Sequence, residues 1–168
     1  MQDMAYNEAG VKIIGQKVIE ELLDESRKSP RKRASVCLHT EKSDLVQRMA
    51  MALQPETYMQ AHKHESPAKR ELFTLYQGEV SVLIFDQDGN ITGTYILAPD
   101  KIRTIELSAG IYHSLVALKP DSVVFETKDG PWESVEKDKQ FASWMPAEDS
   151  EKAVECLEDL RVKIGINK

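Results

Sequence analysis

The feature that most constrains the fold is a series of short segments between residues 57 and 127 in which polar and apolar residues alternate. A period of two is typical of β-strands, whose successive side chains point to opposite faces. Turn-forming residues separate the segments, and the run Asp86-Gln87-Asp88-Gly89-Asn90 predicts a hairpin. We expect strands at residues 57–64, 71–76, 79–86, 91–97, 102–107, 113–118 and 122–127. Short strands with regular turns predict a barrel or sandwich with an all-β core.

Helical periodicity is found toward the two ends of the chain. The first helix is expected between residues 15 and 29, where apolar residues recur on one helical face before a proline: Val18, Ile19, Leu22, Leu23 and Pro30. A second short helix is expected at residues 45–53, with Ser43 or Asp44 as its cap and an apolar stripe on one side. A C-terminal helix is expected at about residues 147–162. The sequence therefore predicts N-terminal helices and a C-terminal helix around the β core.

The length of 168 residues suits one globular domain with a single core. Within it we expect three parts: an N-terminal extension of helix and strand at residues 1–54, the β-barrel at 55–130, and a C-terminal loop and helix at 131–168. The extension is expected to pack on the barrel. Cys37 and Cys156 are too few for a disulfide framework, so we expect free thiols.

Charge and hydropathy exclude some classes of partner. A net charge of −6 argues against general nucleic-acid binding, which requires clustered positive charge. No segment approaches the run of about 20 apolar residues that a membrane helix needs. The first residues lack the basic and apolar regions of a secretory signal, so we expect a cytoplasmic protein.

Three of the four histidines lie in a pattern that suits metal binding. In the first predicted strand of the barrel, His62 and His64 share one face. Glu71 begins the next predicted strand, where a returning chain would bring its carboxylate beside the two imidazoles. A glycine-containing turn then delivers His113 at the head of a later strand. Imidazole and carboxylate ligands suit Fe(II), Mn(II), Ni(II) or Zn(II), so we expect one divalent metal ion with open coordination positions.

Four further residues are candidates for binding a small-molecule ligand. Strand alternation places Tyr58 and Gln60 on the same face as His62, where they would line a polar pocket. Arg33 and Arg70 belong to basic clusters that we expect near the open end of the barrel. Guanidinium groups there would bind the carboxylate or phosphate of an anionic sugar. The other interpretation of both arginines is solvated surface charge.

The histidine pattern resembles that of the cupins, small β-barrels in which two motifs supply three histidines and one glutamate to a divalent metal. The first motif reads here as H-K-H-x6-E-x6-G, and the second keeps Gly110 and His113 at the family spacing. Six residues separate His64 from Glu71, where the family has three or four, and Ser108 stands at the position of a proline. The resemblance implies a jelly-roll barrel, or double-stranded β-helix, with the metal ligands His62, His64, Glu71 and His113.

Residues 11–148 resemble more specifically the WbuC-type cupin-fold metalloproteins, which are found with bacterial surface-polysaccharide gene clusters. The segments that carry this likeness are 29–31, 46–49, 54–58, the H-x-H pair, 112–118 and 141–148. The resemblance implies a metal-binding barrel, a link to polysaccharide biosynthesis and a homodimer, and it supplies no defined reaction.

Our leading functional hypothesis is a metal-dependent cupin that acts on or binds a sugar or sugar nucleotide. As an enzyme it would be an isomerase, an epimerase or an oxygenase. One alternative is a non-catalytic module that binds a metal or a sugar. The other is a metal-free epimerase-like cupin in which histidine and tyrosine act as base and acid.

Overall fold

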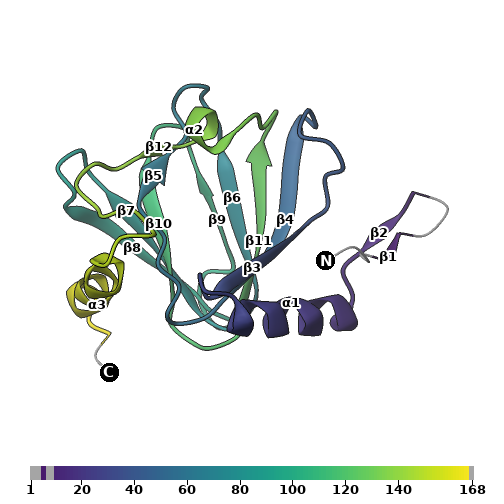
Figure 1. Ribbon diagram of the computed structural model, residues 1–168, viewed down its shortest axis with the longest axis horizontal. Helices are drawn as coiled ribbons and strands as arrows, with labels where there is room; N and C mark the ends of the chain where they lie inside the picture. Colours follow the sequence, from purple (N-terminus) through teal and green to yellow (C-terminus); the bar gives the residue numbers. More distant parts are fainter. Residues whose placement is uncertain (1–4, 7–9, 167–168) are drawn as a thin grey trace.

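The computed structural model describes residues 5–6 and 10–166 of the chain (Figure 1). Strands dominate it, with helices near both ends of the chain. In chain order the elements are β1 (Ala5–Tyr6), β2 (Lys12–Ile13), α1 (Gln16–Lys28), β3 (Arg33–Cys37), β4 (Val46–Leu53), β5 (His62–Lys63), β6 (Glu71–Gln77), β7 (Val80–Phe85), β8 (Ile91–Leu97), β9 (Thr104–Leu107), β10 (Tyr112–Ala117), β11 (Ser122–Asp129), α2 (Val135–Asp138), β12 (Gln140–Phe141) and α3 (Ala153–Lys163). Among the described residues, no helix is both long and apolar enough to span a membrane.

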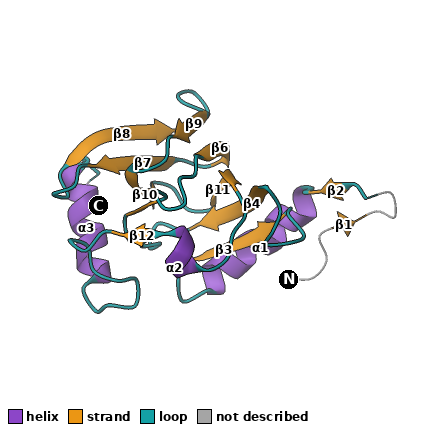
Figure 2. Cartoon of the chain, turned by 90° about the horizontal axis from the view of Figure 1, so that it is seen from above, coloured by secondary structure: helices purple, strands orange, loops and turns teal. Residues whose placement is uncertain are grey.

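Two five-stranded antiparallel sheets form the body of the protein. One has the strand order β12-β5-β10-β7-β8 and the other β3-β4-β11-β6-β9, and β1 and β2 form a separate short hairpin (Figures 1 and 2). The inward side chains of both sheets make one core, which includes Leu53, Phe73, Val82, Leu115 and Val124. Two antiparallel sheets that pack their inner faces together in this way form a jelly-roll barrel, which confirms the predicted fold class.

A helix covers the outer face of each sheet. The apolar side of α1, with Ile19 and Leu22, packs against Val36 of β3 and Ala50 of β4. On the other sheet, Leu157 and Leu160 of α3 pack among residues of β7 and β10 that include Leu83, Phe85 and Val116. Each sheet is therefore buried on two faces, which explains why several of its strands are apolar on both sides.

The interior of the barrel is apolar at one end and polar at the other. Along β11, Val124 belongs to the core, whereas the inward residues Glu126 and Lys128 are buried among polar neighbours. Buried polar residues from other strands gather at the same end: Gln47, His62, Glu71 and His113. Because charged groups are rarely buried without partners, this end of the barrel is where a functional site is expected.

The helix predicted at residues 45–53 is wrong, because Val46–Leu53 forms strand β4 between β3 and β11. The segment is apolar on both faces, with Ala50 and Ala52 packed in the cluster under α1 and Met51 and Leu53 in the barrel core. A run that is buried on both sides shows no clear period of two, so its pattern can be mistaken for a helical stripe. Within the described residues, one helix therefore precedes the barrel instead of two.

The remaining elements agree with the prediction to different degrees. The first helix occupies Gln16–Lys28, and the strand predicted at 91–97 has the same bounds as β8. The strand predicted at 57–64 forms ladder pairs over His62–Lys63, and the C-terminal helix begins at Ala153, later than expected. The N-terminal extension was expected to contain strand as well as helix, but no strand was assigned to the position of β3.

Candidate metal centre

The four candidate ligands come from both sheets and meet at the polar end of the barrel. His62 of β5 lies directly opposite His113 of β10 in one sheet, and His64 follows β5 by one residue. Glu71 begins β6 in the facing sheet. One ligand atom from each of the four residues lies within 4.8 Å of the others, and all four side chains are buried. The structure thus brings together the whole set that the sequence singled out.

Each of the three imidazoles uses its Nδ1 atom for a hydrogen bond to a backbone carbonyl. The acceptors for His62, His64 and His113 are the oxygens of Gln60, Asp138 and Ile111, at 3.1, 2.5 and 3.0 Å. A carbonyl only accepts, so Nδ1 must carry the proton in each ring. In the neutral imidazole the lone pair is then on Nε2. Metal-binding histidines are commonly held in this way, with the second nitrogen donating to a carbonyl or carboxylate.

The atoms that face the middle of the cluster are all electron-pair donors without a hydrogen-bond partner. They are the Nε2 atoms of His62, His64 and His113 and the Oε2 atom of Glu71. Glu71 Oε2 lies 2.8 Å from His113 Nε2 and 3.3 Å from His64 Nε2. For either nitrogen to donate to Glu71, its ring would have to give up the Nδ1 bond or take a second proton. Buried lone pairs that face one another are unfavourable unless a cation lies between them, so these residues fit a divalent metal.

The charges of the cluster also suit a cation. Burial, together with the nearby positive charge of Lys139, holds the pKa of His62 well below its ordinary value, so this ring stays neutral. Burial opposes ionisation of Glu71, whereas a proton on Nε2 of His113 and His64 would lower its pKa well below the usual range, and a metal cation in the same place would do the same. Neutral imidazoles and one carboxylate would leave a bound divalent ion with a net positive charge.

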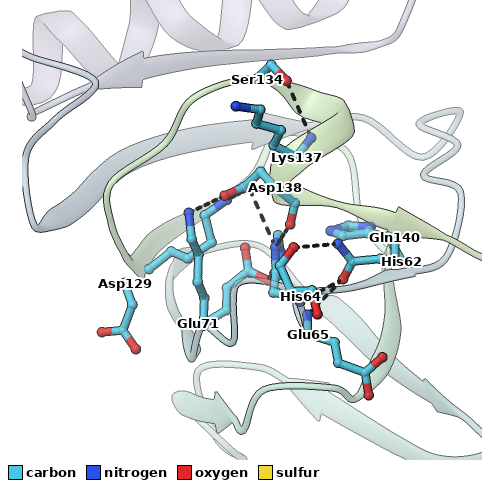
Figure 3. Close-up of polar contacts among 12 residues, drawn as sticks. His62, His64, Glu65, Glu71, Asp129, Ser134, Lys137, Asp138 and Gln140 are labelled. Carbon is cyan, nitrogen blue, oxygen red and sulfur yellow. Dashed lines mark hydrogen bonds and ion pairs between the residues drawn. The ribbon is translucent and has the colours of Figure 1, made fainter.

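A buried ion network supports the cluster from one side (Figure 3). The Asp138 carboxylate is fully buried and accepts hydrogen bonds from Lys69 Nζ at 2.5 Å and Lys128 Nζ at 2.6 Å. The backbone oxygen of the same residue accepts the Nδ1 proton of His64, so α2 positions one candidate ligand. Next to Glu71, burial and the Glu71 charge raise the pKa of Glu126 to about 8. Sequence reasoning missed Asp138, Lys128 and Glu126.

The longer connection before Glu71 turns away from the centre. Glu65 lies on this connection, its carboxylate is exposed, and Lys63 Nζ contacts it at 2.5 Å. In Figure 3 the carboxylate of Glu65 points away from the cluster, whereas Glu71 lies beside His64. The carboxylate in the cluster is therefore that of Glu71, as the spacing from Gly78 suggested.

Three of the four predicted ligand-binding residues lie together in one cavity of about 780 Å³. Arg33, Tyr58 and Gln60 line this cavity, and Arg33 Nη1 donates to the backbone oxygen of Tyr58 at 2.7 Å. The Tyr58 hydroxyl donates to the carbonyl of Pro146 at 2.7 Å, so it is turned toward the C-terminal segment. Their role in ligand binding stays a prediction.

The fourth predicted residue, Arg70, lies elsewhere. Its exposed guanidinium pairs with Asp129 at 2.9 Å, and Figure 3 shows Asp129 pointing away from the centre. Lys69, which precedes it in the same basic cluster, is buried in the network described above. The structure therefore does not bring Arg70 and Arg33 to one site.

Phe141 belongs to the wall of the cavity and lies next to His62 of the candidate metal centre. It lies opposite His62 in the pairing of β12 with β5, and the two rings are 5.9 Å apart. The same side chain is 40% exposed and lines the cavity. A molecule in the cavity would thus contact Phe141, whose ring lies next to that of His62.

Comparison with known families and sequences gives one match. A family model described as "Domain of unknown function (DUF6016)" matches residues 14–97. No curated protein matches this chain in sequence.

Several solved structures are similar in fold to this chain. Salicylate 1,2-dioxygenase from Pseudaminobacter salicylatoxidans is similar over 73% of this chain and 36% of its own, at 13% identity and a TM-score of 0.55. The capsular polysaccharide assembling protein CapF from Staphylococcus aureus is similar over 64% of this chain and 32% of its own, at 16% identity and a TM-score of 0.51. The protein TT1209 from Thermus thermophilus is similar over 66% of this chain and 92% of its own, at 19% identity and a TM-score of 0.50.

These likenesses concern the fold. The identities, 13 to 19%, are too low to carry an activity from any of these proteins to this chain. The chain spans about a third of the length of the dioxygenase and of CapF. The jelly-roll barrel predicted from the sequence is therefore confirmed at the level of the fold.

Proposed function

The chain belongs to the DUF6016 family, whose function is not known, and we propose that it is a cupin-fold protein that binds one divalent metal ion through His62, His64, Glu71 and His113. The observation that carries the proposal is the set of four buried electron-pair donors that face one another without hydrogen-bond partners. The Nδ1 bonds to backbone carbonyls support it, because they turn each Nε2 lone pair toward the same point.

A divalent ion in this centre supplies Lewis acidity for polarising an oxygen of a bound molecule. The residues of the chain contribute position and environment. The carbonyls of Gln60, Asp138 and Ile111 orient the three rings, and Glu71 provides the anionic ligand. The buried ring of Phe73 lies 6.1 Å from that of His113, and the ring of Phe141 lies 5.9 Å from that of His62, so apolar side chains border the centre. A sheltered centre of this kind strengthens electrostatic interactions with a bound polar group.

We further propose that the molecule is a sugar or a sugar nucleotide. The cavity of about 780 Å³ beside the centre lies within the range of small-molecule sites, and Arg33 and Gln60 in its wall offer polar contacts. One structural neighbour is described as a capsular polysaccharide assembling protein. The WbuC-type assignment, the role in surface polysaccharide biosynthesis, the cytoplasmic location and the homodimer belong to the same proposal.

Elemental analysis of the purified protein tests the metal centre. We expect one divalent ion per chain in the wild type and none after the double substitution His62→Ala with His64→Ala, because that variant keeps two of the four ligands. His39→Ala is the matched control, since His39 Nδ1 accepts the backbone N–H of Arg48 and His39 does not belong to the cluster. Full metal occupancy in the double variant would refute the proposed centre.

A second experiment separates an enzyme from a binding module. The metal-loaded protein is incubated with a panel of nucleotide sugars and sugar phosphates, and the products are followed by mass spectrometry. Turnover that disappears in the double variant supports a metal-dependent enzyme. Binding without turnover supports the non-catalytic module, and turnover in the metal-free protein supports the epimerase-like alternative.

A further inference from the structure

The cavity beside the candidate metal centre lies at the open seam of the barrel. Its wall includes Arg33 of β3 and Phe141 of β12, and these two strands are edge strands of the two different sheets. In the view of Figure 2, α2 lies between β12 and β3. An edge-to-edge gap between the sheets is the direction from which a ligand reaches the interior of such a barrel without unfolding a strand.

Lys139 is one of the residues that line this cavity, and it is half-buried. It follows α2 directly, its backbone is extended, and it lines the cavity with Phe141 two residues later. Strand alternation places Lys139 and Phe141 on one face, and Phe141 shares its face with the opposite residue His62. The charge of Lys139 acts on both His62 and Glu126, lowering the pKa of each, which agrees with its position near the centre.

The other charged groups of the cavity are balanced or lie at its rim. Arg31 and Arg33 both contact the carboxylate of Glu148, at 2.5 and 2.6 Å. Two further carboxylates, those of Glu56 and Asp149, belong to exposed residues where water screens them. Lys139 is half-buried, and its ammonium has no ion pair or side-chain hydrogen bond with any residue in the described ranges 5–6 and 10–166.

We propose that Lys139 binds the anionic group, a carboxylate or a phosphate, of the small molecule that reaches the metal centre through this cavity. The inference rests on the proposed function, and it names the substrate class of that site. A half-buried cation without a counterion binds an anion more strongly than a solvated surface lysine does, because less water must be displaced and less screening occurs. The Phe141 ring and the side chain of Gln60 then contact the uncharged part of the same molecule.

Calorimetric titration of the metal-loaded protein tests the proposal. The probes are glucuronate for a carboxylate, glucose 1-phosphate for a phosphate ester, inorganic phosphate for the free anion and glucose for the neutral sugar. We expect Lys139→Gln to weaken binding of an anionic sugar by about tenfold or more, the effect of losing a hydrogen bond to a charged group, and to leave glucose binding unchanged. Lys139→Arg should restore most of the affinity, since it returns the charge.

Lys137→Gln is the matched control. Lys137 lies two residues earlier on α2, is exposed, and pairs with Glu133 at 2.5 Å, outside the cavity. Its loss should leave all affinities unchanged. Metal content is measured for every variant, and Lys139→Gln should keep one ion per chain because it removes no ligand.

The outcomes separate this inference from the proposed function. Equal affinities of wild type and Lys139→Gln for the anionic sugars, or no binding of any anionic probe to the loaded wild type, would overturn the role of Lys139. Binding of inorganic phosphate alone, without preference for either sugar, would overturn the substrate class. A wild type that cannot be loaded with metal would instead overturn the proposed centre, while the comparison of anion affinities still decides the role of Lys139.

Discussion

Replacing Asp138 by Asn should destabilise the protein strongly. The carboxylate is fully buried, and the two ammonium groups that donate to it, at 2.5 and 2.6 Å, belong to side chains that are 3% and 4% exposed. Asparagine keeps the shape but removes the negative charge, so Lys69 would remain buried without its counterion, and Lys128 would lose the carboxylate that it contacts and keep only the neighbouring Glu126 and Glu71. Breaking a buried ion pair by removing one partner costs about 3–5 kcal/mol of unfolding free energy. We expect a loss in this range.

Urea denaturation of the metal-free protein at pH 7, followed by circular dichroism, measures this loss. The matched control is Glu133→Gln, which removes an exposed ion pair with Lys137 on the same segment and should cost at most about 1 kcal/mol. A loss of less than about 1 kcal/mol for Asp138→Asn would show that the two lysines find other partners or water, and it would refute the reasoning.

The pH dependence of unfolding tests the same variant a second time. Burial opposes ionisation of Asp138, but hydrogen bonds from Lys128 and Lys69 outweigh it and lower its pKa. The folded pKa thus lies below the unfolded value of about 3.9, so the contribution to stability is present above that pH and is lost as the pH falls through the folded pKa. The stability difference between wild type and Asp138→Asn should therefore shrink in acid.

Two further predictions concern the neighbouring carboxylates. Glu71→Gln should weaken metal binding by at least about tenfold, whereas Glu65→Gln should leave it unchanged. Isothermal titration with Mn(II) or Ni(II) compares the two variants. Weaker binding in Glu65→Gln than in Glu71→Gln would contradict the ligand assignment. Burial and the charge of Glu71 raise the pKa of Glu126 to about 8 in the folded protein. Protonation of Glu126 therefore stabilises the folded state fully below the unfolded pKa of about 4.3, and this stabilisation is lost as the pH rises toward 8. Glu126→Gln should accordingly gain stability relative to the wild type between pH 5 and pH 8 in metal-free urea titrations, and a difference that does not change with pH would contradict this.

Local patterns sufficed where the physical cause is local. An isolated apolar stripe predicted α1, and turn residues between alternating segments predicted β6, β7 and β8 closely. The same holds for the centre, because His62 and His64 share a strand face by geometry alone, and Glu71 begins the next long strand. These features depend on neighbours within a few residues, so sequence spacing is enough to predict them.

Other features depend on which distant segments of the chain come into contact, and sequence spacing does not predict them. Residues 46–53 form a strand because both neighbours, β3 and β11, offer hydrogen bonds along its length, and burial on both faces hides its period. The two basic clusters that the sequence grouped together are separated, since Arg70 pairs with Asp129 and Arg33 with Glu148.

Alternation and spacing act over a few residues, so the sequence alone predicted the β-rich core and the set of four candidate metal ligands. Only the tertiary structure decided the surroundings of that set. Lys69, Lys128 and Asp138 come from three separate parts of the chain and form one buried network behind His64. Lys139 is a candidate for binding an anion because the pairing of β12 with β5 places it in the wall of the cavity. Charges acquire such roles through desolvation, and desolvation depends on which segments of the folded chain cover them.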